Sequence, residues 1–219
     1  MVARIGEKAP NLRVSKWVQG LPTNIEKEKD NVILVEVFQV NCPGCFLYGI
    51  PEAIEIYRKY RQDGVRVLGV ATAFEDYDKN TLENLELLLT TGQVIGETYK
   101  VLSQYGALKD NKLSYKIPFP VAMDSLKRED GNWTDSRVID FIEGNFPEFR
   151  SYSDLQKADM IMRVREYLKN KLYTAETFEE YALRGTPSSI LIDKRGVLRH
   201  VSFGRNGYLD SMVRELLNE

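Results

Sequence analysis

The sequence predicts an α/β fold in which a mixed central sheet is flanked by helices. Strand-like and helix-like segments alternate along the 219 residues. A β-α-β unit in the first third implies two parallel strands joined by a right-handed crossover. Near the C-terminus, two strand-like runs are separated only by Lys194-Arg195-Gly196, a hairpin turn that makes those strands antiparallel. The sheet is therefore expected to contain both orientations.

The β-α-β unit lies between residues 32 and 72. Residues 32–38, VILVEVF, are apolar and β-branched, as in an interior strand of a parallel sheet. A helix is expected from Cys42 to about Gln62, where Asp63-Gly64 ends it. Residues 65–72 form the second strand of the unit. Before this unit, the lead-in is punctuated by Pro and Gly, and we expect a hairpin around Gly20-Leu21-Pro22.

The remaining elements follow in order. Residues 81–105 have leucines at helical spacing with a break near Gly92, which predicts two helices. Residues 118–124 read as a short strand that ends at a turn. The two final strands cover 188–193 and 197–201, and an amphipathic helix over 209–217 closes the chain.

Composition bounds the class of protein. With 43% hydrophobic residues, one domain spanning residues 1–219 can bury a core without cross-links, elaborated by helical insertions at about 79–114 and 126–177. The net charge of −2 gives no reason to expect nucleic acid or an anionic membrane as a partner. The N-terminal residues lack the apolar stretch of a signal peptide, so we expect a cytoplasmic location and no membrane partner.

The longer insertion is expected to be helical. Ser153-Asp154-Leu155-Gln156 reads as a capping box that opens one helix, and Thr174 as the cap of the next. An apolar face of the first helix has to be buried somewhere. We expect a homodimer contact there, with a wall over the Cys42 groove or packing on the core as the alternatives. The residues of this face are Leu155, Ala158, Ile161, Met162, Leu168 and Leu172.

The two cysteines of the chain form one Cys-X-X-Cys, Cys42-Pro43-Gly44-Cys45. It stands where the buried strand runs into a helix, so Cys42 feels the free N–H groups and positive dipole end of the first turn. Both favour the thiolate, which is the nucleophile. Cys45 can reach Cys42 and close a small disulfide. The pair is therefore predicted to be a two-electron redox couple, with Cys42 as the attacking thiol and Cys45 as the resolving one.

These residues resemble a known family. The strand followed by Cys-Pro-Gly-Cys and a helix is similar to the thioredoxin superfamily. The run GTPSSILID over 185–193, followed by Gly196, resembles TlpA-like and ResA-like thiol–disulfide oxidoreductases and the related AhpC/TSA redoxins. The lead-in GEKAPNL over 6–12 resembles the redoxin opening. The likeness covers about residues 5–78, 115–125 and 178–218.

The resemblance implies a thioredoxin-like fold with a cis peptide bond before Pro187. The loop holding Thr186 and Pro187 would lie against the cysteine pair, so that these two residues, with Pro43 and Gly44, contact an extended substrate peptide. Glu36 interrupts the apolar strand 32–38, where a lone carboxylate is costly unless it is paired or protonated. A buried acid at the matching position of thioredoxins accepts the proton of the resolving cysteine, and the resemblance implies that role for Glu36 toward Cys45.

Three positions depart from the family pattern. Asn41 stands where the family usually has a tryptophan, so that shielding aromatic is absent. Pro51 is six residues after Cys45, where the family usually has five, and a π-type bulge is expected to absorb the extra residue. The proline and hydroxyl of the peroxiredoxin signature are replaced by Val35 and Gln39, which argues against the usual activation of peroxide.

We therefore expect an enzyme, a thiol–disulfide oxidoreductase that reduces or exchanges protein disulfides and is recharged by an upstream electron donor. An atypical peroxiredoxin-like thiol peroxidase and a redox-gated, non-enzymatic binding module are the alternatives. No cofactor is expected. No metal is expected either, because two cysteines and the single, distant His200 are too few ligands for zinc or an iron–sulfur cluster.

Overall fold

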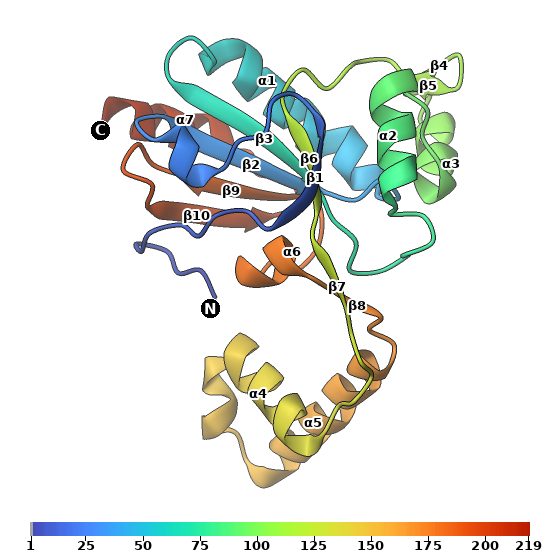
Figure 1. Cartoon of the computed structure of the whole chain (residues 1–219), viewed down its shortest axis with the longest axis vertical. Coiled ribbons are helices and arrows are strands. Elements are labelled where there is room, and N and C mark those ends of the chain that lie inside the picture. The colour runs from blue at the N-terminus through green and yellow to red at the C-terminus, as the bar shows by residue number, and fades with distance from the viewer. Residues whose placement is uncertain (1) are drawn as a thin grey trace.

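The computed structural model describes residues 2–219; Met1 of the predicted domain lies outside this range. A six-stranded sheet forms the centre of the molecule, in the order β1-β6-β3-β2-β9-β10 (Figure 1). Its strands are Val14–Gln19 (β1), Val32–Phe38 (β2), Val65–Ala71 (β3), Val121–Asp124 (β6), Ser188–Ile192 (β9) and Leu198–Phe203 (β10).

The sheet is mixed, as the sequence predicts. Strand β2 runs parallel to β3, with Val32 opposite Val65 and Glu36 opposite Gly69. Strand β6 is parallel to β3 on its other side. Strand β9 is antiparallel to β2, and β10 is antiparallel to β9 across the predicted hairpin. The α/β, thioredoxin-like expectation for the fold is confirmed.

Strand β2 lies at the centre of the sheet, and all seven of its residues are buried. Because side chains alternate along a strand, Val32, Leu34 and Phe38 join the core on one face. Ile33, Val35 and Val37 join the core on the other face. This double burial explains why the sequence shows a continuous apolar run in place of a polar alternation.

Two helices pack on the first of these faces. Helix α1 (Ile50–Tyr60) supplies Ile50, Ala53 and Ile56, and helix α7 (Leu209–Asn218) supplies Leu209 and Val213. Both bury an apolar stripe at helical spacing and expose charged residues on the opposite side, as amphipathic surface helices do. Among residues 2–219, no helix combines the length and the apolar character needed to cross a membrane.

The predicted break at Gly92 separates helices α2 (Leu82–Thr91) and α3 (Gly96–Gln104). Gly92 has a φ of 76°, the left-handed conformation that ends a helix at low cost when no side chain is present. A short hairpin of β4 (Leu108–Lys109) and β5 (Lys112–Leu113) follows. This segment stands at one end of the sheet in Figure 1.

The hairpin expected around Gly20-Leu21-Pro22 is wrong. The strand that precedes these residues, β1, pairs antiparallel with β6 at the edge of the sheet and not with β2, the next strand along the chain. Between β1 and β2 the chain forms a single 3-10 turn, η1 (Ile25–Glu28). The Gly20-Leu21-Pro22 run is therefore part of the connection from β1, at the edge of the sheet, to β2, at its centre. The neighbours of β2 are the two buried strands β3 and β9.

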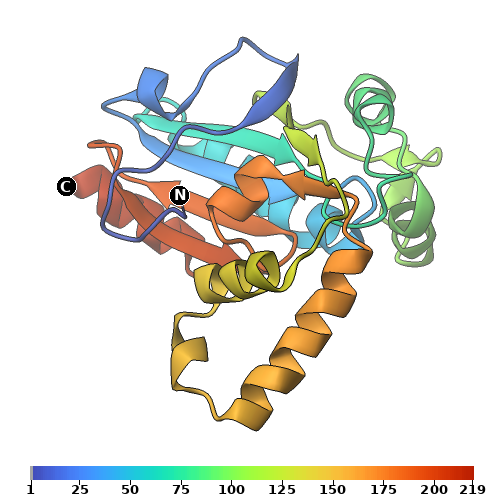
Figure 2. The same ribbon diagram turned by 60° about the horizontal axis from the view of Figure 1, so that its bottom comes forward.

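The long insertion projects away from the sheet on a two-stranded ribbon (Figure 2). Strands β7 (Leu126–Arg128) and β8 (Tyr173–Ala175) form the ribbon. Beyond it lie α4 (Asp135–Asn145), a 3-10 turn η3 (Pro147–Ser151) and α5 (Asp154–Lys169). Four residues of this segment form a small buried cluster of their own: Val138, Ile142, Phe149 and Leu168.

The predicted capping box of α5 is present. The Ser153 hydroxyl accepts from the Gln156 amide, and the Gln156 side chain accepts from the Ser153 amide. The predicted apolar face is correct only in part. Leu168 is buried, but Leu155 and Met162 are 82% and 64% exposed. The stripe that contacts α4 instead runs through Met160, Ile161, Val164 and Leu168, rotated by part of a turn from the predicted one.

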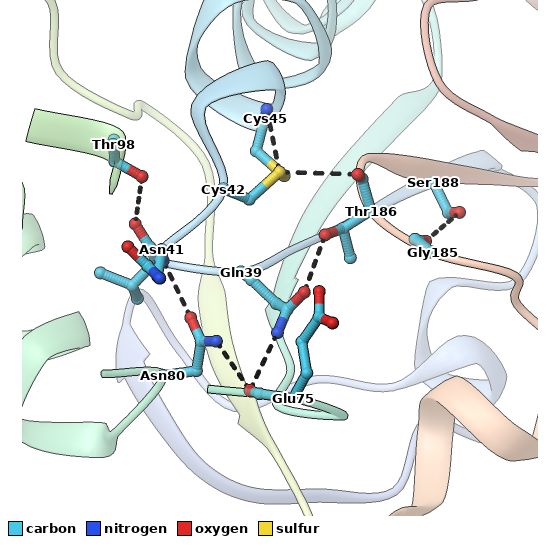
Figure 3. Close-up of a disulfide and its surroundings, with 11 residues drawn as sticks. Gln39, Asn41, Cys42, Cys45, Glu75, Asn80, Thr98, Gly185, Thr186 and Ser188 are labelled. Carbon is cyan, nitrogen blue, oxygen red and sulfur yellow. Dashed lines mark hydrogen bonds between the residues drawn. A yellow bond between two sulfur atoms is a disulfide. The ribbon is translucent and has the colours of Figure 1, made fainter. Parts of the chain in front are cut away.

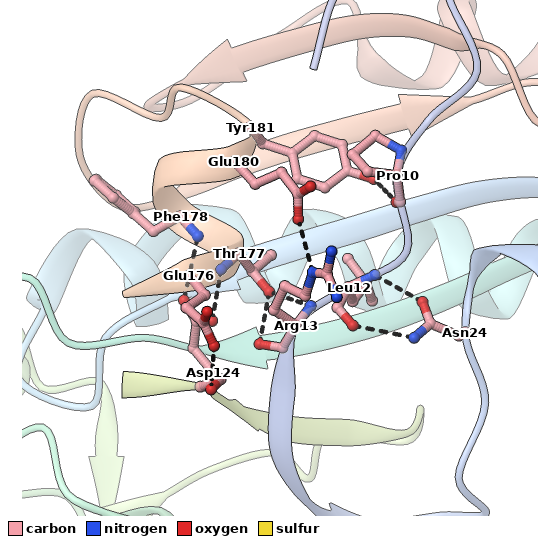
Figure 4. A network of polar contacts seen from close by, with 11 residues as sticks. Pro10, Leu12, Arg13, Asn24, Asp124, Glu176, Thr177, Phe178, Glu180 and Tyr181 are labelled. Carbon is pink, nitrogen blue, oxygen red and sulfur yellow. Dashed lines mark hydrogen bonds and ion pairs between the residues drawn. The ribbon is translucent and has the colours of Figure 1, made fainter. Parts of the chain in front are cut away.

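The predicted cap at Thr174 is also wrong, because Thr174 belongs to β8. The next helix, α6 (Glu176–Glu180), is held by a side chain from far along the chain (Figure 4). Asp124 accepts hydrogen bonds from the amides of Thr177 (2.8 Å) and Phe178 (3.2 Å) and from the hydroxyl of Thr72 (2.8 Å). This carboxylate fixes the chain as it returns from the insertion to the core.

Candidate active site

The cysteine pair lies just beyond the C-terminal end of β2. Cys42 and Cys45 are joined in a disulfide; Cys42 is half-buried and Cys45 is fully buried. The amide of Cys45 donates to Sγ of Cys42 at 3.2 Å, as expected for a sulfur at a helix start. Only Cys42 is therefore positioned to meet a large partner, and its greater exposure agrees with the attacking role predicted for it.

The helix after the disulfide begins with a π-helical turn, η2 (Cys45–Gly49), which runs directly into α1. The turn accommodates the extra residue between Cys45 and Pro51, so the predicted π-type bulge is confirmed. Pro51 consequently falls directly after the π-helical turn and has no N–H to donate to it, and the Phe46 carbonyl oxygen of that turn instead accepts from the Tyr115 hydroxyl at 2.7 Å.

The loop before β9 lies against the disulfide (Figure 3). The peptide bond between Thr186 and Pro187 is cis. The carbonyl oxygen of Thr186 lies 3.5 Å from Sγ of Cys42. On the other side of the pair, a Cβ added to Gly44 would lie 3.7 Å from Cδ of Pro187. The four residues predicted to contact substrate, Pro43, Gly44, Thr186 and Pro187, are therefore neighbours in space.

Glu36 is completely buried beneath this site. One of its carboxyl oxygens, Oε2, accepts a hydrogen bond from the hydroxyl of Ser189 at 2.7 Å. The other, Oε1, has no hydrogen-bond partner in the part of the chain that the structure describes. The pKa of Glu36 is raised to about 8: burial is the largest cause, the Ser189 hydrogen bond lowers the pKa, and the negative charge of Glu52 raises it.

Gly49 separates Glu36 from the start of α1. A Cβ at this position would overlap both Oε1 of Glu36 and Cβ of Pro187. The absence of a side chain thus lets the helix that carries Cys45 approach the buried acid and the proline loop together. Glu36, Cys45 and Pro187 come from three separate segments, and Gly49 is the point at which those segments meet.

Polar side chains that the sequence does not reveal hold the loop in place. We call Gln39, Asn41, Asp76 and Asn80 the polar frame. Gln39 accepts from the Thr186 hydroxyl at 3.1 Å and donates to the carbonyl oxygen of Glu75 at 3.3 Å. The amide of Asn41 donates to Oδ1 of Asn80 at 2.8 Å. The frame therefore connects the proline loop, the redox loop and the segment that follows β3 (Figure 3).

Asn41 is the central member of the frame. Its side chain donates to Oδ2 of Asp76 at 2.7 Å and accepts from the amide of Glu97, at the start of α3, at 2.8 Å. Asn41 is 9% exposed, and a Cβ on Gly96 would overlap its carbonyl oxygen. The position where the family usually has an exposed aromatic thus holds a hydrogen-bonded connector to α3.

The same segment after β3 also contacts the base of the insertion. Phe74 stacks on Phe178 with ring centroids 4.4 Å apart, and the Tyr77 ring packs edge-on against Tyr173 at 5.2 Å. Residues 74–80 therefore contact both the redox loop and the ribbon. Two polar residues directly before the cysteine motif, Gln39 and Asn41, were the one available signal for the frame, but the sequence does not show their partners.

Solved structures with similar folds agree with this geometry. A thioredoxin-like superfamily protein, SPOA0173, is 26% identical, with a TM-score of 0.61 and 98% of both chains covered. A thiol-disulfide isomerase from Corynebacterium glutamicum is also 26% identical, with a TM-score of 0.59 over 99% of this chain and 97% of that one. This chain therefore has the fold of thioredoxin-like proteins, among them a thiol-disulfide isomerase.

More distant relatives support the same fold. A putative thiol:disulfide interchange protein DsbE from Chlorobium tepidum is 16% identical, with a TM-score of 0.52 over 98% of this chain and 99% of that one. Protein DipZ of Mycobacterium tuberculosis is 21% identical over 217 residues, which are 96% of this chain and 21% of DipZ. The chain thus spans about a fifth of the length of that relative. No protein-family model matches this chain.

Proposed function

We propose that this protein is a thiol–disulfide oxidoreductase that reduces or exchanges disulfides of protein substrates through Cys42 and Cys45. The observation that carries the proposal is the asymmetry of the pair: Cys42 is half-buried beside the Thr186 carbonyl, whereas Cys45 is fully buried over Glu36. One thiol can reach a partner, and the other can reach only its neighbour. That division suits an attack followed by an internal resolution.

In the first step, the thiolate of Cys42 attacks one sulfur of the substrate disulfide. A Cys42–substrate bond forms, the substrate S–S bond breaks, and the other substrate sulfur leaves as a thiolate that takes a proton from solvent. The start of helix η2 stabilises the attacking thiolate through the Cys45 amide. The backbone of Thr186, with Pro187, Pro43 and Gly44, supplies the surface on which the substrate chain lies.

In the second step, Cys45 loses its proton and attacks Sγ of Cys42. The Cys42–Cys45 disulfide forms, and the second substrate sulfur leaves as a thiolate. Two electrons have then passed from the protein dithiol to the substrate. Glu36 accepts the Cys45 proton, because it is the titratable side chain that packs against the helix start beneath Cys45. A dithiol donor restores the reduced pair by the same two steps in reverse.

Reduction of insulin tests the proposal. With dithiothreitol as electron donor, the wild-type chain is expected to accelerate insulin precipitation, and Cys42→Ser is expected to reduce the rate to that of dithiothreitol alone. Cys45→Ser should accumulate a mixed disulfide, which identifies the natural partner by mass spectrometry. A wild-type chain that does not reduce insulin but consumes hydroperoxide with dithiothreitol present would contradict the proposal and support a peroxidase.

The surroundings of the enzyme form a second part of the proposal. A cytoplasmic location and an upstream dithiol donor stay predictions, and they favour the reductive direction because cytoplasmic thiols are kept reduced.

The homodimer also stays a prediction. It would bury exposed apolar residues of α5, among them Leu155 and Met162. Light scattering tests it, and a monomer at high micromolar concentration would exclude the dimer.

A further inference from the structure

A cavity of about 900 Å³ opens beside the active site, between α1 and the connection from β10 to α7. At the end nearest the disulfide it is lined by Leu47 and Tyr48. Glu52 and Glu55 line it from α1, and Arg205 lines it from the opposite side. The cavity is thus a solvent-accessible space that begins two residues after Cys45, at Leu47, and carries two carboxylates of α1.

The proposed resolving step leaves a proton on Glu36, and that proton has to reach solvent before the next cycle. Glu36 is 0% exposed, so it cannot exchange with bulk water directly. Its neighbour Ser189 already donates to Oε2. The free oxygen, Oε1, faces Gly49, the position at which a Cβ would overlap it. The carboxyl oxygen that is free to pass on a proton therefore lies against Gly49.

Glu52 lies on the same side of the helix as Gly49, because residues three apart on a helix are neighbours. It is half-buried and lines the cavity, so it stands between the buried acid and solvent. The two carboxyls interact electrostatically, since the charge of Glu52 raises the pKa of Glu36. Glu55, one turn farther on, lines the same cavity but is exposed.

Burial raises the pKa of Glu52 itself, the Asn206 amide and Arg205 oppose this shift, and Glu55 adds to it. The other charged groups of the cavity are Arg58 and Lys59 on α1 and Asp210 on α7. Lys59 and Asp210 pair with each other at 2.7 Å. Neither Glu52 nor Glu55 takes part in a salt bridge within residues 2–219. Glu52 is thus a carboxylate that remains free to bind and release a proton.

We infer that Glu52 is the proton-exchange residue of this enzyme, connecting the buried acid Glu36 with solvent through the cavity between α1 and α7. The inference rests on the proposed function. Cys45 gives its proton to the Glu36 carboxylate, and the Glu36 carboxylic acid passes that proton from Oε1 to the Glu52 carboxylate. Glu52 then releases it to water in the cavity. Glu52 is then ionised again, and Glu36 can return to the ionised form that accepts the next proton, which is the minor form at neutral pH because its pKa is about 8.

Stopped-flow reaction of the reduced protein with 5,5′-dithiobis(2-nitrobenzoate) separates the steps. Attack by Cys42 releases one coloured thiolate, and resolution by Cys45 releases a second. We expect Glu52→Gln to leave the first phase unchanged and to slow the second about tenfold at neutral pH. Glu52→Asp should restore part of the rate. Glu55→Gln, in the same cavity and on the same helix, is the matched control and should resolve at the wild-type rate.

The direction of the effect decides between two roles of Glu52. If it acted only through its charge, its removal would lower the pKa of Glu36, ionise more of that base at neutral pH and accelerate the second phase. An unchanged or faster second phase in Glu52→Gln would therefore overturn the inference. Far-UV circular dichroism shows whether the variant is folded. A wild-type chain that reduces no disulfide would instead refute the proposed function, so the two failures are distinguishable.

Discussion

The redox core and the helical insertion differ in how their residues are held. Around the disulfide, β2 is buried on both faces. The polar frame connects the redox loop by hydrogen bonds to the proline loop, to residues 74–80 and to α3. The insertion between β7 and β8 depends on four buried side chains and on exposed ion pairs such as Arg163–Asp159. From this difference we expect the insertion to unfold locally at a lower free energy than the core, without loss of the chemistry.

The largest expected effect falls on the core. Cys42→Ser should abolish reduction of insulin, because no other thiol of the enzyme reaches a substrate. Cys45→Ser should retain one attack per molecule, measured as a single equivalent of released chromophore with 5,5′-dithiobis(2-nitrobenzoate). If Cys42→Ser kept a turnover rate near that of the wild-type chain, the assignment of the two thiols would be wrong.

Glu36→Gln tests the buried acid. The pKa of Glu36 is raised from 4.5 to about 8 by burial, so the folded state binds this proton more tightly than the unfolded state does. That contribution to stability is complete below pH 4.5 and is lost as the pH rises toward 8. The loss is on the order of 5 kcal/mol, at about 1.4 kcal/mol for each pH unit.

Urea denaturation of the oxidised protein between pH 5 and pH 9 measures the effect of Glu36→Gln. The variant carries no titrating group at this position, so its free energy of unfolding should fall less than that of the wild-type chain over this range. The same variant should slow the second phase of the chromophore assay and not the first. Equal pH dependence of the two proteins would show that Glu36 ionises as it does in water.

A pair of leucine truncations compares the two regions directly. Leu34 in the core and Leu168 in the insertion are both 0% exposed. Leu34→Ala should lower the global free energy of unfolding by about 3 kcal/mol. Leu168→Ala leaves a similar cavity, but we expect faster amide exchange confined to α4 and α5 and a rate of insulin reduction within about twofold of wild type. A global loss of stability in Leu168→Ala would show that the insertion folds with the core.

The two regions also differ in how far the sequence predicts them. Strand β2, the cysteine pair and the π-helical turn follow from apolar runs, fixed spacings and the position of Pro51. The contacts of Asn41 with Asp76 and of Asp124 with Thr177 join residues 35 and 53 positions apart, and no periodicity marks such pairs. In α5, two adjacent apolar stripes satisfy helical spacing. Only tertiary packing against α4 selects the stripe that contains Met160 and Val164.

Asn41→Ala tests the polar frame. It removes the hydrogen bond that the Asn41 side chain donates to Asp76 and the one that it accepts from the Glu97 amide. The Asp76 carboxylate then lacks its donor from Asn41. We expect a cost of about 2 kcal/mol in the free energy of unfolding, together with slower insulin reduction because the redox loop loses its connection to α3. A variant with wild-type activity and unchanged amide exchange at the start of α3 would argue against a positioning role.

The smallest effect is expected on the surface of the insertion. Arg163 and Asp159 form an exposed pair on α5, with side chains 76% and 48% exposed. Arg163→Ala should change the free energy of unfolding by less than about 0.5 kcal/mol, since solvent and salt screen such pairs. A larger loss in thermal or urea unfolding would indicate a partner for this face of α5.

Partial alkylation of the reduced protein is the most direct test of the central claim, that Cys42 attacks and Cys45 resolves. Reduced protein is treated briefly with iodoacetamide near neutral pH, and the labelled cysteine is identified by peptide mass spectrometry. Cys42 is half-buried at the helix start, and Cys45 is fully buried. The account predicts that label accumulates first on Cys42. Label that appears first on Cys45 would contradict it.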